Sequence, residues 1–248
     1  MKSLSALALA CAALAFSLPA LAAPPRDEAL LASPLGLVLL LGVVAVLPFA
    51  FMTLTAFVKI STVLQIVRGA IGAQNVPSNV IVMALAGALT LLAMAPLGSR
   101  VTARAEPVLA TAEERPTTVW VVELWEAVRE PVRGFLRANA SVRERGRFFD
   151  AARAARPAAD RDGVGRDDLL VLVPAFVITE LAEAFALGFA LYLPFLVIDL
   201  VVANVLLALG MQMLNPTQVS LPFKLLLFVA IDGWGLLSQA LVTGYALG

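Results

Sequence analysis

Long apolar stretches, separated by short polar ones, make up most of this chain of 248 residues. Residues 35–58 form an apolar run of 24 residues. An α-helix of that length spans about 36 Å, which is enough to cross a bilayer with some tilt. A second apolar run covers residues 80–97, and the stretch between the runs contains only Lys59 and Arg68 as charged residues. The pattern predicts a first helical hairpin over residues 35–99.

The chain becomes apolar again at residue 169 and stays so to residue 248. Residues 169–209 are too long for one span, so we predict that this stretch divides near Gly188 and that residues 189–209 form a third crossing. A turn with the sequence GMQMLNPTQVSLP then precedes a fourth crossing at residues 223–247. Because positively charged short loops stay in the cytoplasm, we predict that Lys59 and Arg68 are cytoplasmic and that residues 100–168 are periplasmic.

Residues 100–168 carry most of the charge in the chain, with 13 arginines and 12 acids, or 25 of the 36 charged residues. Within this block, residues 119–140 repeat apolar positions at intervals of three and four, which is typical of an amphipathic helix. The string DRDGVGRDD resembles a calcium loop only faintly, because it lacks the closing glutamate, and a solvated loop is the simpler interpretation. The block is therefore predicted to be an extramembrane helical insert without a metal.

Residues 1–22 have the order of a cleavable signal peptide: one lysine, an apolar run, a proline and a small-residue site. An uncleaved anchor is the alternative. Residues 23–34 are then a linker before the first hairpin. Cleavage would leave the mature N-terminus outside the cytoplasm of a bacterial cell, with the chain in the inner membrane.

The amino-acid composition excludes several classes of function. Hydrophobic residues make up 60% of the chain and charged residues 15%, which is outside the range of ordinary soluble domains. The net charge is zero, so nothing favours nucleic-acid binding. Histidine is absent, and the single cysteine, Cys11, falls in the predicted signal peptide. Ser-His and Cys-His catalysis, the usual zinc ligands and a phosphate-binding GxxxxGK[ST] loop are all missing, so we expect no enzyme and no cofactor.

Several charged residues nevertheless lie in or beside the apolar segments. A charge within hydrocarbon costs at least about 2.5–3.5 kcal/mol, so each is a functional or structural candidate. These residues are Lys59, Arg68, Glu180, Glu183, Asp199, Lys224 and Asp232. For either lysine alone, the simpler expectation is that its ammonium group reaches the headgroups from a helix end. Glu180 and Glu183 are three residues apart and share a helical face.

An ion pair between Asp199 and Lys224 is attractive but conflicts with a regular hairpin. If the turn runs from Gly210 to Ser220, Asp199 lies about 16 Å from it and Lys224 about 6 Å. Asp199 would instead be level with Asp232. We therefore expect Lys224 to meet an acid of a neighbouring subunit, unless a broken helix corrects the register.

The turn itself contains Met211, Gln212, Met213 and Leu214. Methionine is deformable, so several copies of this loop around an axis would form a compliant apolar constriction. The alternative is a loop packed under neighbouring helices.

Five strings in the chain resemble a known family: FVKISTVLQIVRGAIG, NVPSNV, PAFVITELAEAF, YLPFLVIDLVVANVLLALGMQML and SLPFKLLLFVAIDGW. They are similar to the SctR (YscR/HrcR) family of type III secretion export apparatus proteins, whose flagellar counterpart is FliP. The resemblance implies a mostly α-helical export-gate subunit, a homopentamer joined to SctS-like and SctT-like subunits and near SctU-like and SctV-like components. Secreted proteins would leave the cytoplasm unfolded through it. In such an assembly the hydropathy spans are lifted largely out of the bilayer.

The resemblance also assigns residues. The family's methionine-rich gasket falls on Met211, Gln212, Met213 and Leu214, and Gln212 stands where methionine is usual. The family's acid in a Ser-Glu-Leu-Lys string corresponds to Glu180. Lys59-Ile-Ser61 is more similar to the virulence branch, although a cleavable signal is more typical of the flagellar one.

Two other functions use the same acids. Asp199 and Asp232 could be relay carboxylates of a small-solute or proton-coupled transporter, but the two halves of the chain show no inverted repeat. An intramembrane aspartyl protease would need these carboxylates about 3 Å apart, and no sequence motif supports it.

Overall fold

The computed structural model describes residues 34–73, 76–111 and 117–245, in which every regular element is a helix. The predicted signal peptide lies outside these residues. The chain forms two compact units, Met1–Pro48 and Phe49–Gly248. Helix α3 (Pro34–Leu54) begins in the first unit, where its Leu41, Val44 and Leu47 side chains are exposed. The predicted mostly α-helical class is confirmed.

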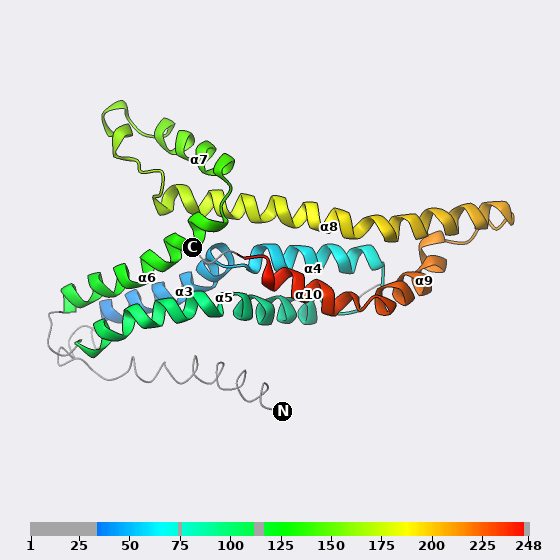
Figure 1. Ribbon diagram of the computed structural model, residues 1–248, viewed down its shortest axis with the longest axis horizontal. Helices are drawn as coiled ribbons and strands as arrows, with labels where there is room; N and C mark the ends of the chain where they lie inside the picture. The colour runs from blue at the N-terminus through cyan, green and yellow to red at the C-terminus, as the bar shows by residue number, and fades with distance from the viewer. Residues whose placement is uncertain (1–33, 74–75, 112–116, 246–248) are drawn as a thin grey trace. The chain divides into compact units, whose positions relative to one another are not determined.

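The second unit contains the remaining elements (Figure 1), which are α4 (Phe57–Ile71), α5 (Asn79–Ala110), α6 (Thr117–Asn139), α7 (Val142–Ala154), a short 3-10 helix η2 (Ala158–Gly163), α8 (Leu169–Ala208), α9 (Pro216–Ala230) and α10 (Gly233–Thr243). Local sequence explains several helix ends. The side chains of Ser78, Ser141 and Asn215 each accept a backbone N–H from the first turn of the helix that follows. Gly72 adopts a left-handed conformation that ends α4.

Helix α4 lies at the centre of the core of the second unit. Its fully buried side chains recur at intervals of three and four: Ile60, Val63, Leu64 and Val67. Helices α8 and α5 both pack against α4 (Figure 1). They contribute the buried residues Leu172, Ala175, Phe176, Val82 and Ala86. Most of the surface of α4 is therefore buried, and α4 is the central helix of this core.

The predicted division of residues 169–209 near Gly188 is wrong, because α8 is one helix of 40 residues. Gly188 has a packing role instead. A Cβ atom at this position would lie 2.5 Å from Ile66 Cδ1, so the missing side chain lets α4 and α8 approach closely. Pro174 and Pro194 are accommodated within the helix.

Two described helices, α5 and α8, are long and apolar enough to cross a membrane. The number rises to four if each of two bent pairs forms one span: Val44–Leu54 with Phe57–Ile71, bent by 68°, and α9 with α10, bent by 58°. Neither predicted crossing, at residues 35–58 or at residues 223–247, is a single helix, because each contains one of these bends.

Each break has a local cause. The Thr55 hydroxyl donates to the Phe51 carbonyl and accepts the Phe57 N–H, which interrupts the backbone ladder between α3 and α4. At the second break, Asp232 has a φ of 51°, and a side chain on the next residue, Gly233, would collide with the Phe228 ring.

The charged block does not begin at a helix boundary. Helix α5 continues from the second apolar run through residue 100 to Ala110. The amphipathic helix predicted at residues 119–140 is confirmed as α6. Helix α8 begins directly after its N-cap residue Asp168, which is the predicted end of the block.

Candidate functional site

A cluster of three polar residues joins α8 to α9, and we call Asp199, Ser220 and Lys224 the hairpin cluster. Lys224 Nζ lies 2.6 Å from Asp199 Oδ2. The Ser220 hydroxyl donates to Asp199 Oδ1 at 2.5 Å. Lys224 also donates to the backbone carbonyl of Ala70, at the C-terminal end of α4, at 3.2 Å. The cluster therefore ties the α8–α9 hairpin to α4.

The expectation that Asp199 and Lys224 cannot meet within one chain is wrong. The turn ends earlier than Ser220, because Asn215 caps α9 and the helix begins at Pro216. Lys224 is thus eight residues into α9, about 12 Å from its start, and Asp199 is nine residues before Ala208, about 14 Å from the end of α8. The two side chains are level, and an intersubunit partner is unnecessary for Lys224.

The loop at the tip of this hairpin contains residues 210–214, which we call the methionine loop. Gly210 has a φ of 73°, and the Met211 N–H donates to the Leu206 carbonyl at 2.9 Å, which turns the chain away from α8. Met213 is 99% exposed. Met211, Gln212 and Leu214 are also exposed. Within one chain the loop is not packed under neighbouring helices.

A second cluster lies in the core, and we call Lys59, Glu180, Glu183 and Tyr245 the core charge cluster. Lys59 Nζ is 3.1 Å from Glu180 Oε1 and 2.6 Å from Glu183 Oε2. The Tyr245 hydroxyl donates to Glu180 Oε2 at 2.5 Å. Glu180 is 1% exposed, whereas the Glu183 side chain is 54% exposed. The shared helical face predicted for the two glutamates is confirmed by their common partner.

Two expectations for the lysines are wrong. Neither Lys59 nor Lys224 extends to a surface, since they are 6% and 2% exposed. Lys59 and Arg68 also lie within α4 rather than in a loop, because the helix starts immediately after the break at Thr55. Both lysines are buried because a carboxylate of α8 faces each of them.

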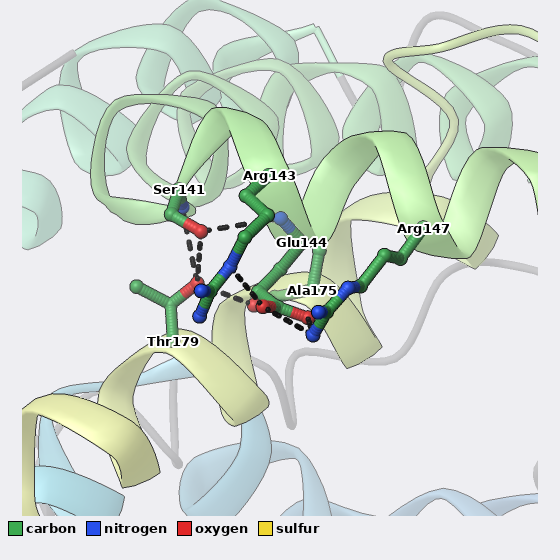
Figure 2. Close-up of polar contacts among 6 residues, drawn as sticks. All are labelled: Ser141, Arg143, Glu144, Arg147, Ala175 and Thr179. Atoms are coloured by element: carbon green, nitrogen blue, oxygen red, sulfur yellow. Dashed lines mark hydrogen bonds and ion pairs between the residues drawn. The ribbon is translucent and has the colours of Figure 1, made fainter.

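A third polar cluster docks α7 onto α8 (Figure 2). The Ser141 hydroxyl accepts the Glu144 N–H, while the Ser141 N–H donates to the Thr179 hydroxyl at 3.0 Å. In a capping box, the glutamate at the third helical position would accept the N–H of the N-cap residue. Here Thr179 accepts the Ser141 N–H instead, and the Glu144 carboxylate accepts from Arg143 and Arg147, each at 3.0 Å. This cluster fixes the start of α7 on α8.

Asp232 is not part of any of these clusters. It is exposed at the break between α9 and α10, eight residues beyond Lys224 or about 12 Å further along the chain direction of α9. Both oxygens of Asp199 are occupied by Ser220 and Lys224. The pairing of Asp199 with Asp232 that a protease or a two-acid relay needs is therefore not supported, and their predicted common level is wrong.

Sequence reasoning missed Ser220 and Tyr245. Ser220 had a usable signal, since it precedes Lys224 by one helical turn. Tyr245 had none, because no helical register connects it to Glu180, 65 residues earlier.

Comparison with known proteins gives a consistent result. The profile of the FliP family matches residues 40–241. The chain is 43% identical over 209 residues to the hypersensitivity response secretion protein HrcR of Ralstonia nicotianae, covering 84% of this chain and 96% of that protein. It is 39% identical over 212 residues to Yop proteins translocation protein R of Yersinia pestis, covering 85% and 96%. It is 37% identical over 214 residues to virulence protein YscR of Salmonella typhimurium, covering 86% and 98%.

Proposed function

Because the chain belongs to the FliP family and is a component of a type III protein export apparatus, we propose that it is a core export-gate subunit. In this role it forms part of the channel through which unfolded proteins leave the cytoplasm. The names of the relatives, which refer to hypersensitivity, Yop and virulence proteins, support an injectisome rather than a flagellar system.

The observation that carries this proposal is uncovered apolar surface around the methionine loop. The second half of α8 and the residue after it expose large side chains on the way to the loop, namely Leu193, Val197, Leu200, Val201, Val205, Leu207 and Leu209. Met211, Met213 and Leu214 extend the same apolar character over the tip. Contiguous apolar surface of this kind is typical of an interface with protein or lipid. Copies of this chain arranged around an axis would cover α8 and bring the loops together as a gasket.

The partners follow from the same role. The subunit forms a homo-oligomer, a pentamer, with SctS-like and SctT-like subunits, near SctU-like and SctV-like components. It resides in the bacterial inner membrane with residues 100–168 on the periplasmic side. The buried Lys59 and Lys224 and the partly buried Asp199 support a passive conduit rather than an enzyme, because each is engaged in an ion pair.

The test is a native mass measurement on the complex extracted in detergent. Five copies of this chain with smaller apolar partners would support the proposal. A stable monomer, or a complex without those partners, would contradict it. Secretion of effector proteins by cells lacking this chain provides the functional readout, with the wild-type chain restored as the control.

A further inference from the structure

Tyr245 connects elements that are far apart in the sequence. It follows α10, which ends at Thr243, by two residues. Its hydroxyl donates to Glu180 Oε2 on α8, and it lies 3.3 Å from the carbonyl oxygen of Ala56, at the break between α3 and α4. Its ring centroid is 4.6 Å from Lys59 Nζ and 6.1 Å from the Phe135 ring of α6. One side chain thus contacts α4, α6, α8 and the break.

These contacts control the geometry of the Lys59–Glu180 pair. A carboxylate has two oxygens, and Tyr245 occupies Oε2 while Lys59 pairs with Oε1. The ring stacks against the ammonium group, which favours a cation electrostatically. Lys59 is only 6% exposed even though its other partner, Glu183, is half exposed. Tyr245 is therefore placed to orient Glu180 and to exclude water from Lys59.

We propose that Gly244 and Tyr245 form a strap that closes over the core charge cluster, with Tyr245 as the positioning residue for the Lys59–Glu180 pair. Through its side chain, Tyr245 joins the break between α3 and α4 to α8. When the strap leaves, Lys59 and Glu180 become accessible to water while the hairpin cluster stays closed. This inference concerns a single chain and does not depend on the proposed export function.

The sequence offers a direct readout, because its only lysines are Lys2, Lys59 and Lys224. The full chain, in its detergent-extracted complex, is exposed to an amine-reactive ester, and modification of each lysine is followed by mass spectrometry. We compare the wild type with Tyr245→Ala and Tyr245→Phe. Tyr192→Ala is the matched control, because Tyr192 lies on the exposed surface of α8.

Tyr245→Ala should raise the modification rate of Lys59 roughly tenfold, since a hydrogen bond to a carboxylate and a cation–π contact together contribute at least that factor. Tyr245→Phe keeps the ring and should give a smaller increase. Lys224 should react at the wild-type rate in every variant, as should Lys59 in Tyr192→Ala.

Two results would overturn the strap. One is an unchanged Lys59 rate in Tyr245→Ala. The other is an equal rise at Lys59 and Lys224, which would mean that Tyr245 supports the whole fold rather than this cluster.

Discussion

Both lysines in the described part of the chain are buried and neutralised by carboxylates on α8, and each pair joins α8 to a different helix. Lys59 belongs to α4 and Lys224 to α9. Removing one partner of a buried pair leaves an unpaired charge, which costs far more than the pair itself contributes. The two clusters therefore act as register locks: they penalise any arrangement of the helices in which the charges fail to meet.

The hairpin cluster gives the first test of this idea. Lys224→Met or Asp199→Asn alone should lower the free energy of unfolding by about 3 kcal/mol, because each leaves one charge without its partner. The double variant should be closer to wild type than either single variant. Unfolding of the detergent-solubilised chain with increasing SDS measures all three. Additive losses would contradict the register lock.

The core charge cluster gives the second test, because its two glutamates differ in burial. Glu180→Gln should destabilise by about 2–3 kcal/mol, since it weakens a buried charge-assisted bond to Lys59. Glu183→Gln is the matched control and should cost less than about 1 kcal/mol, because water screens its exposed carboxylate. The same SDS titration compares them. Equal losses would show that burial does not set the contribution of these acids.

At the scale of the elements, the close packing of α4 on α8 depends on Gly188. Gly188→Ala should lower the free energy of unfolding by about 1–3 kcal/mol, because the new methyl group would overlap Ile66. Gly69→Ala on α4 is the control: nothing lies within 4 Å of a Cβ atom there. It should be neutral or stabilising by up to about 1 kcal/mol, since alanine favours a helix.

A compensating change sharpens this prediction. Ile66→Val removes the atom nearest to the new methyl group, so it should recover part of the loss when combined with Gly188→Ala. Thermal unfolding of the two single variants and the double variant measures the recovery. If the two losses simply add, the contact between Ile66 and residue 188 is not the cause.

The helices that the sequence predicted well are those with a strong periodic pattern or a polar cap. The extent of α6 follows from its amphipathic repeat, and the start of α8 follows from the change at Asp168. The breaks at Thr55 and Asp232 could not be predicted in the same way. They arise from local hydrogen bonding and backbone conformation, which do not change the hydropathy pattern of the sequence. The predicted division at Gly188 was wrong for a related reason. From sequence alone, a glycine that permits close helix packing cannot be distinguished from one that turns the chain.

The charged residues of the candidate site were predictable, but Ser220, Tyr245 and most of the pairings were not. Placing a charged side chain in an apolar segment costs free energy, and this cost alone identified five candidates from the sequence: Lys59, Glu180, Glu183, Asp199 and Lys224. The prediction for Lys224 was wrong because it assumed that the turn lasts to Ser220, whereas α9 begins four residues earlier, at Pro216. Asn215 followed by proline was the available signal, since asparagine is a favoured N-cap and proline a favoured first helical residue.

At the scale of the whole molecule, Gln212 in the methionine loop is the residue that bears most on the proposed gate. If copies of the methionine loop meet in a ring as proposed, Gln212 would add amides that hold water beside an otherwise apolar seal. Gln212→Met should therefore reduce ion leakage through the resting complex, measured as conductance in planar bilayers. Gln239→Met on α10 is the control. Greater leakage after Gln212→Met would show that the amides close the gate rather than loosen it.

The strap also has a consequence for biosynthesis. Ala56 and Tyr245 are separated by 189 residues, so at roughly 5–20 residues per second the ribosome needs about 10–40 s to deliver the tyrosine after the break has emerged. Until then Lys59 lacks the ring of Tyr245, and for more than half of the interval neither Glu180 nor Lys224 has been synthesised. The core charge cluster can therefore be completed only after α10, the last described helix, has been made.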